Sequence, residues 1–253
     1  MDNEYNVYED INTRTGGELY LGIVGPVRTG KSTFIKNFME LMVIPEMQDE
    51  AEKVRTRDEL PQSSDGKTIM TTEPKFIPKE GARIQMPSGE SGKVRLIDCV
   101  GFVVKDAVGY REEEKERMVK TPWYDEEIPF TKAAQIGTSK VIREHSNIGI
   151  IVTTDGSFTE LSREQYIEGE EKTVAECKVA GKPTIMILNT RVPHQESTKT
   201  LAKNLQDKYG ISVLVMDCKN LKKEDVFSMM ETILADFPIG QIQFYFPKWV
   251  EFL

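Results

Sequence analysis

The stretch GPVRTGKST, residues 25–33, holds residue types that proteins use to bind phosphate groups. Its first eight residues match G-x-x-x-x-G-K-[ST], in which glycines let backbone N–H groups approach phosphate oxygens at the start of a helix. In this pattern Lys31 brings a positive charge to the β and γ phosphates, and the Ser32 hydroxyl is a ligand for Mg²⁺. The motif predicts a nucleotide-binding loop made of Gly25, Pro26, Val27, Arg28, Thr29, Gly30, Lys31, Ser32 and Thr33.

A phosphate loop of this kind needs an acidic residue at the end of a neighbouring strand to complete the magnesium site. Two residues compete for this role, Asp98 at the end of VRLID and Asp155 at the end of GIIVTTD. Only Asp98 starts a D-x-x-G turn, whose glycine, Gly101, has an N–H that could reach a γ-phosphate. We therefore expect Asp98 to be the catalytic, metal-binding carboxylate and Asp155 to be a strand-end or capping residue.

A threonine in the segment GKTIMTTEP could sense the γ-phosphate. Its hydroxyl would bind Mg²⁺ and its backbone N–H would bind the phosphate, as in switch loops that nucleotide orders. Thr71 and Thr72 are the main candidates, Thr72 also as a metal ligand, and Thr68 is a weaker one. Threonine is also common at strand starts because of its β-propensity alone, so the flanking motifs carry this assignment.

Arg28 is an unusual residue for the middle of a phosphate loop. Near the β–γ bridge its guanidinium could stabilise charge that develops in phosphoryl transfer, as an arginine finger does. It could equally point into a neighbouring subunit, pair with an acidic residue or lie in solvent. We keep Arg28 as both a catalytic and a phosphate-binding candidate.

The expected elements place these residues in an α/β fold. Residues 18–25 read as a buried strand and residues 31–44 as a helix, while the polar stretch 45–72 reads as an irregular connection. A hairpin is expected over residues 73–101, followed by a second irregular stretch over 102–129. The rest alternates between helices (130–145, 166–180, 196–210 and 223–237) and strands (147–154, 182–189 and 211–217). Such alternation predicts a mostly parallel sheet with helices on both faces.

The composition limits the class of protein. With 41 acidic and 33 basic residues the net charge is −8, which argues against a nucleic-acid binder that relies on positive charge. The three cysteines, Cys99, Cys177 and Cys218, lack metal-ligand spacing and are expected to be free thiols in a reducing compartment. The N-terminal residues do not resemble a signal peptide, and no apolar run could cross a bilayer. We therefore expect a cytoplasmic protein.

The order of phosphate loop, threonine, hairpin and D-x-x-G resembles the Ras-like and translation-factor GTPases. Two motifs of that class are altered. Asn189 begins the stretch in which N-K-x-D should bind guanine, but Thr190 and Val192 replace its lysine and aspartate. Because the acceptor for the guanine edge is missing, we expect ATP to be accepted and preferred. Phe102 replaces the glutamine that orients water, so we expect it to pack and intrinsic hydrolysis to be slow or completed by another group.

Several stretches resemble a narrower family, the stage IV sporulation protein A ATPases of endospore-forming bacteria. These stretches are GGELYLGIVGPVRTGKSTFIKNFMEL, DELPQSSDGKTIMTTEPKF, RLIDCVG, TPWYDEEIPF and IIVTTDGS. The resemblance implies Mg²⁺-dependent ATP hydrolysis by a Ras-like domain that has lost guanine specificity. It makes Lys31 the Walker A lysine, Asp98 the Walker B aspartate, and Thr71 and Thr72 the sensor threonines.

The same resemblance implies partners and a place in the cell. Members of the family self-assemble into a static polymer on the mother-cell side of the forespore surface, where it is the base layer for other spore coat proteins. They are about twice as long as this chain, and their membrane anchoring lies in a C-terminal part. We expect a polar leader at residues 1–16 and an ATPase domain at 17–238. Residues 239–253 are either an edge strand or the start of a following domain. Two alternatives stay open: a GTPase switch, and a scaffold that binds nucleotide without appreciable hydrolysis.

Overall fold

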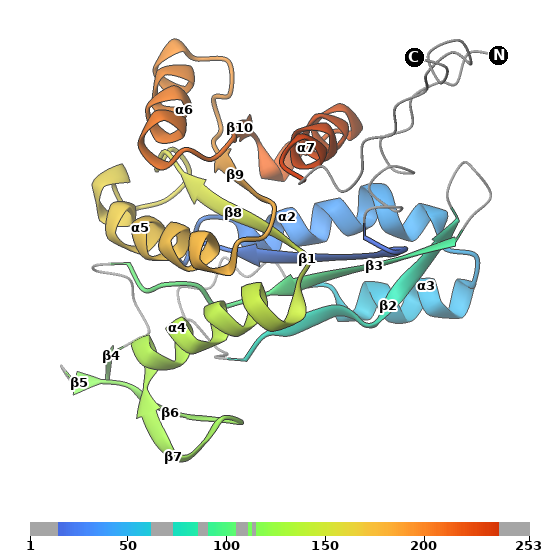
Figure 1. The fold of residues 1–253 in the computed structure, drawn as a ribbon, viewed down its shortest axis with the longest axis horizontal. Coiled ribbons are helices and arrows are strands. Elements are labelled where there is room, and N and C mark those ends of the chain that lie inside the picture. Colours follow the sequence, from blue (N-terminus) through green and yellow to red (C-terminus); the bar gives the residue numbers. More distant parts are fainter. Residues whose placement is uncertain (1–14, 62–72, 86–90, 105–110, 113–114, 238–253) are drawn as a thin grey trace, which may run out of the picture.

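The computed structural model describes residues 15–61, 73–85, 91–104, 111–112 and 115–237. Its centre is a six-stranded sheet in the order β10-β9-β8-β1-β3-β2 (Figure 1). Only the pairing of β2 with β3 is antiparallel. The strands of the sheet are β1 (Glu18–Val24), β2 (Lys75–Gln85), β3 (Ser91–Asp98), β8 (Ile148–Thr154), β9 (Thr184–Asn189) and β10 (Val213–Met216). The structure thus confirms the expected α/β class with a mostly parallel sheet.

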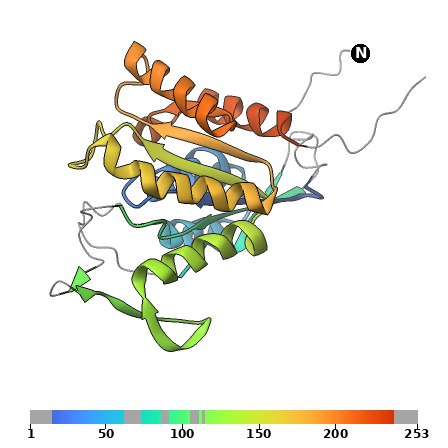
Figure 2. The same cartoon turned by 60° about the vertical axis from the view of Figure 1, so that its left-hand side comes forward.

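Helices cover both faces of this sheet (Figures 1 and 2). On one face, α2 and α7 bury Phe34, Met229 and Ile233 against Ile23 and Ile150. The other face packs α5 and α6 against β8 and β9. The helices are α2 (Lys31–Phe38), α3 (Glu50–Glu59), α4 (Phe130–Lys140), α5 (Arg163–Ala180), α6 (Glu196–Tyr209) and α7 (Lys223–Ala235).

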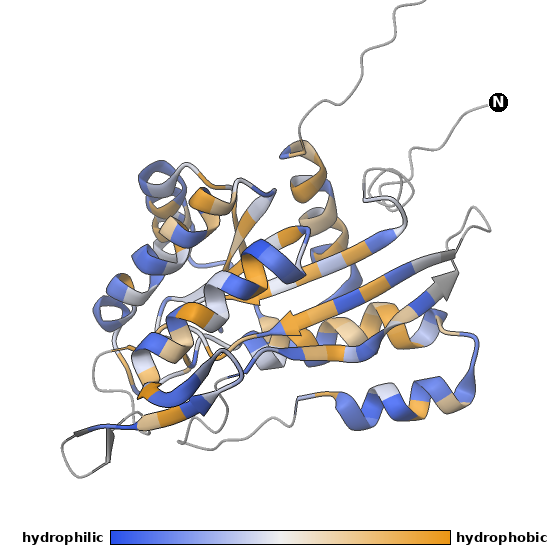
Figure 3. Cartoon of the chain, turned by 60° about the horizontal axis from the view of Figure 1, so that its bottom comes forward, coloured by the Kyte–Doolittle hydropathy of each residue, from blue (hydrophilic) through white to orange (hydrophobic). Residues whose placement is uncertain are grey.

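Alternation along each strand divides the apolar side chains between two cores. In β9, Ile185 and Ile187 face the α2 and α7 side, whereas Met186 and Leu188 face the α5 and α6 side. All seven residues of β8 are buried. Strands covered on both faces read as nearly continuous apolar runs, which is why they were predictable (Figure 3).

Several predicted helices change geometry at their ends. The helix expected over residues 31–44 begins as α2 and continues as a π-helical segment, Met39–Val43, and a 3-10 turn, Ile44–Glu46. Likewise α4 continues as a π-helical segment, Val141–His145. As predicted, α6 stops at Gly210, whose left-handed φ of 61° suits glycine.

The expectation of an irregular connection over residues 45–72 was wrong in part, because α3 lies within it. The Asp49 side chain accepts a hydrogen bond from Ala51 N–H and caps the helix, and Glu59 accepts one from Lys79 N–H of β2 at 2.8 Å. Thr56 is the one residue of α3 that is fully buried. A helix that buries so few side chains has no apolar stripe, and for this reason hydrophobic periodicity did not predict α3.

The expectation of an irregular stretch over residues 102–129 was also wrong in part. Two short strands, β4 (Arg111–Glu112) and β5 (Lys115–Glu116), pair with each other, and β6 (Met118–Thr121) pairs with β7 (Tyr124–Pro129). Val119 and Ile128 face each other across the β6–β7 hairpin and pack against α4. In Figure 2 this hairpin projects from the body beyond α4.

Candidate nucleotide-binding site

The predicted phosphate loop joins β1 to α2 at the carboxyl edge of the sheet. Lys31 Nζ donates hydrogen bonds to the carbonyl oxygens of Gly25 at 3.2 Å and Pro26 at 2.7 Å, and Thr29 Oγ1 donates to Pro26 O at 3.0 Å. The loop therefore closes around the Lys31 ammonium. Burial lowers the pKa of Lys31, and the neighbouring Cys99 and Asp98 oppose this shift.

Arg28 lies in the left-handed region with a φ of 63°, the one described residue other than glycine with a positive φ. This conformation costs an ordinary side chain about 1–2 kcal/mol. Bonds on both sides hold it: Val27 N–H donates to Phe102 O at 2.9 Å, and Thr29 O accepts from Asn189 Nδ2 at 2.9 Å. Strain that the surroundings enforce is typical of functional loops.

Asp98 and Ser32 meet at the mouth of this loop. Parallel pairing sets Asp98 of β3 opposite Ile23 of β1, and Ser32 Oγ donates to Asp98 Oδ2 at 2.9 Å. The second oxygen, Asp98 Oδ1, is buried and has no hydrogen-bond partner in the described part of the chain. Burial raises the pKa of Asp98, while the Lys31 charge opposes the rise.

The Ser32 hydroxyl and the Asp98 carboxylate fit a magnesium ion. Mg²⁺ prefers hard oxygen ligands and usually takes one or two protein side chains, with water and phosphate completing its shell. Asp98 Oδ1 is a buried acceptor that lacks a hydrogen-bond donor. An oxygen in this state is free to bind a cation or a water molecule of the cation's shell. Within the described residues no group of three or more His, Cys, Asp or Glu could hold a metal by itself.

Gly101 and Phe102 lie directly on the phosphate loop. A Cβ at Gly101 would come within 1.9 Å of Gly25 O and 2.6 Å of Lys31 Nζ, so no larger residue fits there. Phe102 is 6% exposed, and its side chain lies against Gly169 of α5. The packing role expected for Phe102 is confirmed, and its carbonyl adds the bond to Val27 N–H.

Asn189 joins three segments that are distant in sequence. Its Nδ2 donates to Thr29 O, and its Oδ1 accepts from Cys218 N–H at 3.0 Å. Its polar atoms thus hold the phosphate loop and the segment after β10. A contact between Asn189 and a bound nucleotide stays a prediction.

Asp155 directly follows β8, which agrees with the strand-end position that was one of the two expectations for it. Its Oδ1 accepts from Ser157 N–H at 2.9 Å and its Oδ2 from Thr190 Oγ1 at 2.5 Å. Thr190, which replaces the lysine of N-K-x-D, is fully buried. The Asp155 carboxylate and the Thr190 hydroxyl therefore form hydrogen bonds within the protein itself.

Sequence reasoning missed a buried support behind the phosphate loop. A Cβ at Gly169 would lie 3.3 Å from Pro26, so α5 packs closely on the loop. The next residue, Glu170, is fully buried and contacts Thr153, Arg163 and Tyr209 at 2.5, 2.8 and 2.8 Å. Gly169, a glycine inside a predicted helix, was the one signal in the sequence for this close packing.

Thr68, Thr71 and Thr72 lie outside the described residues.

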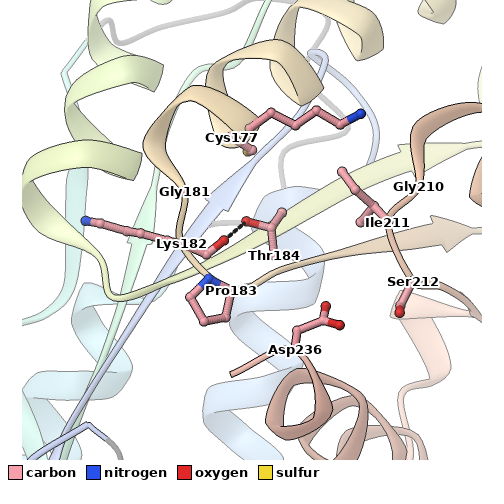
Figure 4. A pocket seen from close by; sticks show the side chains of 10 residues that line it. Cys177, Gly181, Lys182, Pro183, Thr184, Gly210, Ile211, Ser212 and Asp236 are labelled. Carbon is pink, nitrogen blue, oxygen red and sulfur yellow. Dashed lines mark hydrogen bonds between the residues drawn. The ribbon is translucent and has the colours of Figure 1, made fainter. Parts of the chain in front are cut away.

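A pocket of about 440 Å³ lies at the opposite edge of the sheet, where β9 and β10 begin (Figure 4). None of the predicted site residues lines it. Lys182, on its wall, directs its ammonium to the carbonyl oxygens of Arg143 and Ser146. This pocket is therefore separate from the phosphate loop.

The three cysteines are free and buried, as expected. Burial raises the pKa of Cys99 to about 11 and that of Cys177 to about 12. The pKa of Cys218 is raised further for the same reason. At neutral pH all three are protonated and hidden, so they are poor nucleophiles.

Comparison with known proteins agrees with this geometry. Residues 1–238 match the family model of the stage IV sporulation protein A ATPase domain. The stage IV sporulation proteins A of Clostridioides difficile (strain 630) and Bacillus subtilis (strain 168) are 52% identical over 246 residues and 49% identical over 245 residues. Each match covers 97% of this chain and 50% of the relative, so the chain spans about half the length of these relatives. The chain belongs to the stage IV sporulation protein A family and carries its ATPase domain.

Proposed function

We propose that this chain binds ATP with Mg²⁺ at the phosphate loop and hydrolyses it. The observation that carries the proposal is the convergence of Lys31, Ser32 and Asp98, with one Asp98 oxygen lacking a donor. The strand order, with β2 as the one antiparallel strand, supports a Ras-like arrangement of the P-loop fold. The family match supports ATPase activity.

Each residue has a distinct part in this proposal. Loop N–H groups from residues 25–33 and the Lys31 ammonium bind the phosphates. Ser32 and Asp98 hold Mg²⁺, together with Thr72 and with Thr71 as an alternative. Mg²⁺, when bound, neutralises charge on the phosphate oxygens. The Gly101 N–H would bind the γ-phosphate, so loss of that phosphate would release the D-x-x-G segment.

Arg28 takes the role that the buried Phe102 cannot fill. Phe102 packs against α5 and has no group to orient water. Arg28 lies in the loop itself, and its guanidinium would stabilise charge on the transferring phosphoryl group. Replacing it with glutamate or alanine should leave ATP binding within a few fold and reduce turnover by two orders of magnitude or more. If binding is lost together with turnover, Arg28 is only a binding residue.

The central experiment compares hydrolysis of ATP and GTP by this chain. We expect Mg²⁺-dependent turnover of ATP, preferred over GTP because residue 192 is valine and Thr190 is bonded to Asp155. Lys31→Ala should abolish it. Turnover of GTP alone would reject the proposal and favour a GTPase switch. Turnover per molecule that rises with protein concentration would indicate an active site that is completed between subunits.

A scaffold that holds ATP without hydrolysing it is the second candidate. The buried Phe102 favours it, since the chain then lacks the usual group for orienting water. A single-turnover measurement separates the two functions. ATP that stays intact over hours, although it is bound with Lys31-dependent affinity, would favour the scaffold.

At the level of the full-length protein, we propose that hydrolysis drives self-assembly of the spore coat base layer. Its partners would be further copies and other coat proteins, and its C-terminal part would contact the forespore membrane from the cytoplasmic, mother-cell side. The names of its relatives support sporulation as the setting. In the described part of the chain, no helix is long and apolar enough to span a membrane. Sedimentation of the full-length protein with ATP, against Lys31→Ala, tests this proposal.

A further inference from the structure

Phe158 is a half-buried aromatic residue beside the phosphate loop, in the segment that leads from β8 to α5. A Cβ placed on Gly30 would lie 3.8 Å from Phe158 Cζ and 2.3 Å from Asn189 Nδ2. Phe158 belongs to none of the four apolar clusters that the described residues form. The packing of the domain therefore does not account for a phenylalanine at this position.

Hydrogen bonds on both sides of Phe158 fix the segment that carries it. Ser157 Oγ accepts from Arg191 N–H at 3.0 Å, which ties the segment to the residues after β9. On the other side, Thr159 Oγ1 accepts from the Tyr166 hydroxyl of α5 at 3.0 Å. Tyr166 is itself fully buried, so this anchor is rigid. The backbone therefore holds the Phe158 ring next to the phosphate loop.

The positions of Asp98 and Gly101 set the direction in which a bound nucleotide would run. Asp98 ends β3 and bonds to Ser32, and a Cβ on Gly101 would lie 2.6 Å from Lys31 Nζ. In the proposed function, this side of the loop takes Mg²⁺ and the γ-phosphate. In the sheet, β8 and β9 lie on the other side of β1 from β3. The sugar and base, at the far end of the phosphate chain, would therefore extend toward the ends of β8 and β9.

Phe158 and Asn189 both lie at this far end. Asn189 is the last residue of β9 and begins the stretch in which N-K-x-D would bind guanine. Here Thr190 is bonded to Asp155, and residue 192 is valine, so the stretch offers no carboxylate to the edge of a base. An aromatic ring can instead bind a base through the face of the ring.

We propose that the Phe158 ring stacks on the base of the bound ATP. This inference rests on the proposed function, ATP binding at the phosphate loop, and adds a base-binding residue to it. Stacking uses the π-face that every base has. Phe158 would therefore add affinity, whereas the preference for adenine over guanine would come from the altered residues 190 and 192.

The test compares the binding of ATP and of inorganic tripolyphosphate, each with Mg²⁺, by isothermal titration calorimetry. Phe158→Ala should weaken ATP binding roughly tenfold or more, as expected when an aromatic ring that stacks on a base is truncated. Tripolyphosphate has no base to stack, so its affinity should stay within about twofold of that of the unaltered chain. A residue that only supported the loop would change both affinities alike.

Phe158→Trp gives a spectroscopic readout of the same contact. The indole keeps an aromatic face, so ATP affinity should be retained. Its fluorescence should be quenched by ATP but not by tripolyphosphate, after subtraction of the signal of the unaltered chain, which has two tryptophans. Tyr124→Ala is the matched control: it removes a ring that is 45% exposed on the β6–β7 hairpin and should leave ATP affinity unchanged.

Circular dichroism checks that every variant is folded. The stacking contact is overturned if Phe158→Ala binds ATP as tightly as the unaltered chain, or if it loses tripolyphosphate affinity by the same factor as ATP affinity. Failure of the proposed function would look different. An unaltered chain whose ATP affinity depends on Phe158 but which does not hydrolyse ATP would retain the stacking contact and reject the proposed hydrolysis.

Discussion

Asn189→Ala is the substitution for which the structure gives the clearest expected magnitude. The Asn189 amide is 5% exposed and bonds to Thr29 O and Cys218 N–H, both in fully buried residues. Alanine leaves both backbone groups without a partner, at about 1–3 kcal/mol each. We expect the free energy of unfolding to fall by roughly 2–5 kcal/mol, a large part of the total stability of a domain.

The assay is urea unfolding followed by circular dichroism, with ATP affinity measured on the same samples. Affinity should fall as well, because Thr29 and the strained Arg28 lose the bond that holds them. Asn37→Ala is a matched control: Asn37 also donates from its amide to two carbonyl oxygens, those of Cys218 and Lys219, but nearer to solvent. Water can replace those bonds, so we expect a loss below about 1 kcal/mol.

The reasoning would be refuted by either of two results. The first is an Asn189→Ala variant whose stability lies within about 0.5 kcal/mol of the unaltered chain. The second is a loss equal to that of Asn37→Ala. Either would mean that the two bonds of Asn189 do not hold the phosphate loop.

Three further predictions concern the turn at Gly101, the buried Glu170 and the three cysteines. Gly101→Ala should abolish ATP turnover in a folded protein, because its Cβ would overlap Gly25 O; normal turnover in a steady-state assay would contradict the placement of this turn. Glu170→Ala should cost about 3–5 kcal/mol in thermal or chemical unfolding, since it leaves the half-buried Arg163 without its fully buried carboxylate partner; a change below 1 kcal/mol would show that water replaces it. The three thiols should react with a thiol reagent at pH 7 only after unfolding, because burial hides them and raises their pKa values; fast reaction of the native chain would contradict this.

The sequence predicted the nucleotide site wherever the signal is local. The phosphate loop is contiguous, and its function depends on residue types at fixed spacing between a strand and a helix. Asp98 was preferred over Asp155 through the D-x-x-G spacing, and the structure places Asp98 against Ser32. The strands and helices after residue 130 were predictable because burial on both faces leaves a strong apolar pattern.

Elements that bury few side chains could not be predicted from hydrophobic periodicity. The charged α3 is held by the Asp49 cap and by one bond to β2, neither of which leaves a periodic signal. The β6–β7 hairpin buries only alternate residues of two short strands. The roles of Thr71 and Thr72 stay predictions, since both residues lie outside the described part of the chain.

By itself, then, the sequence determined the phosphate-binding chemistry and the succession of strands and helices. Both depend on neighbouring residues, through motif spacing and through hydrophobic period. Only the tertiary structure decided what supports the loop: Asn189 bonds to Thr29 across 160 residues, and Gly169 of α5 lies against Pro26 and Phe102. Such contacts arise when the sheet brings distant segments to one edge, and no local pattern encodes which side chains will meet there.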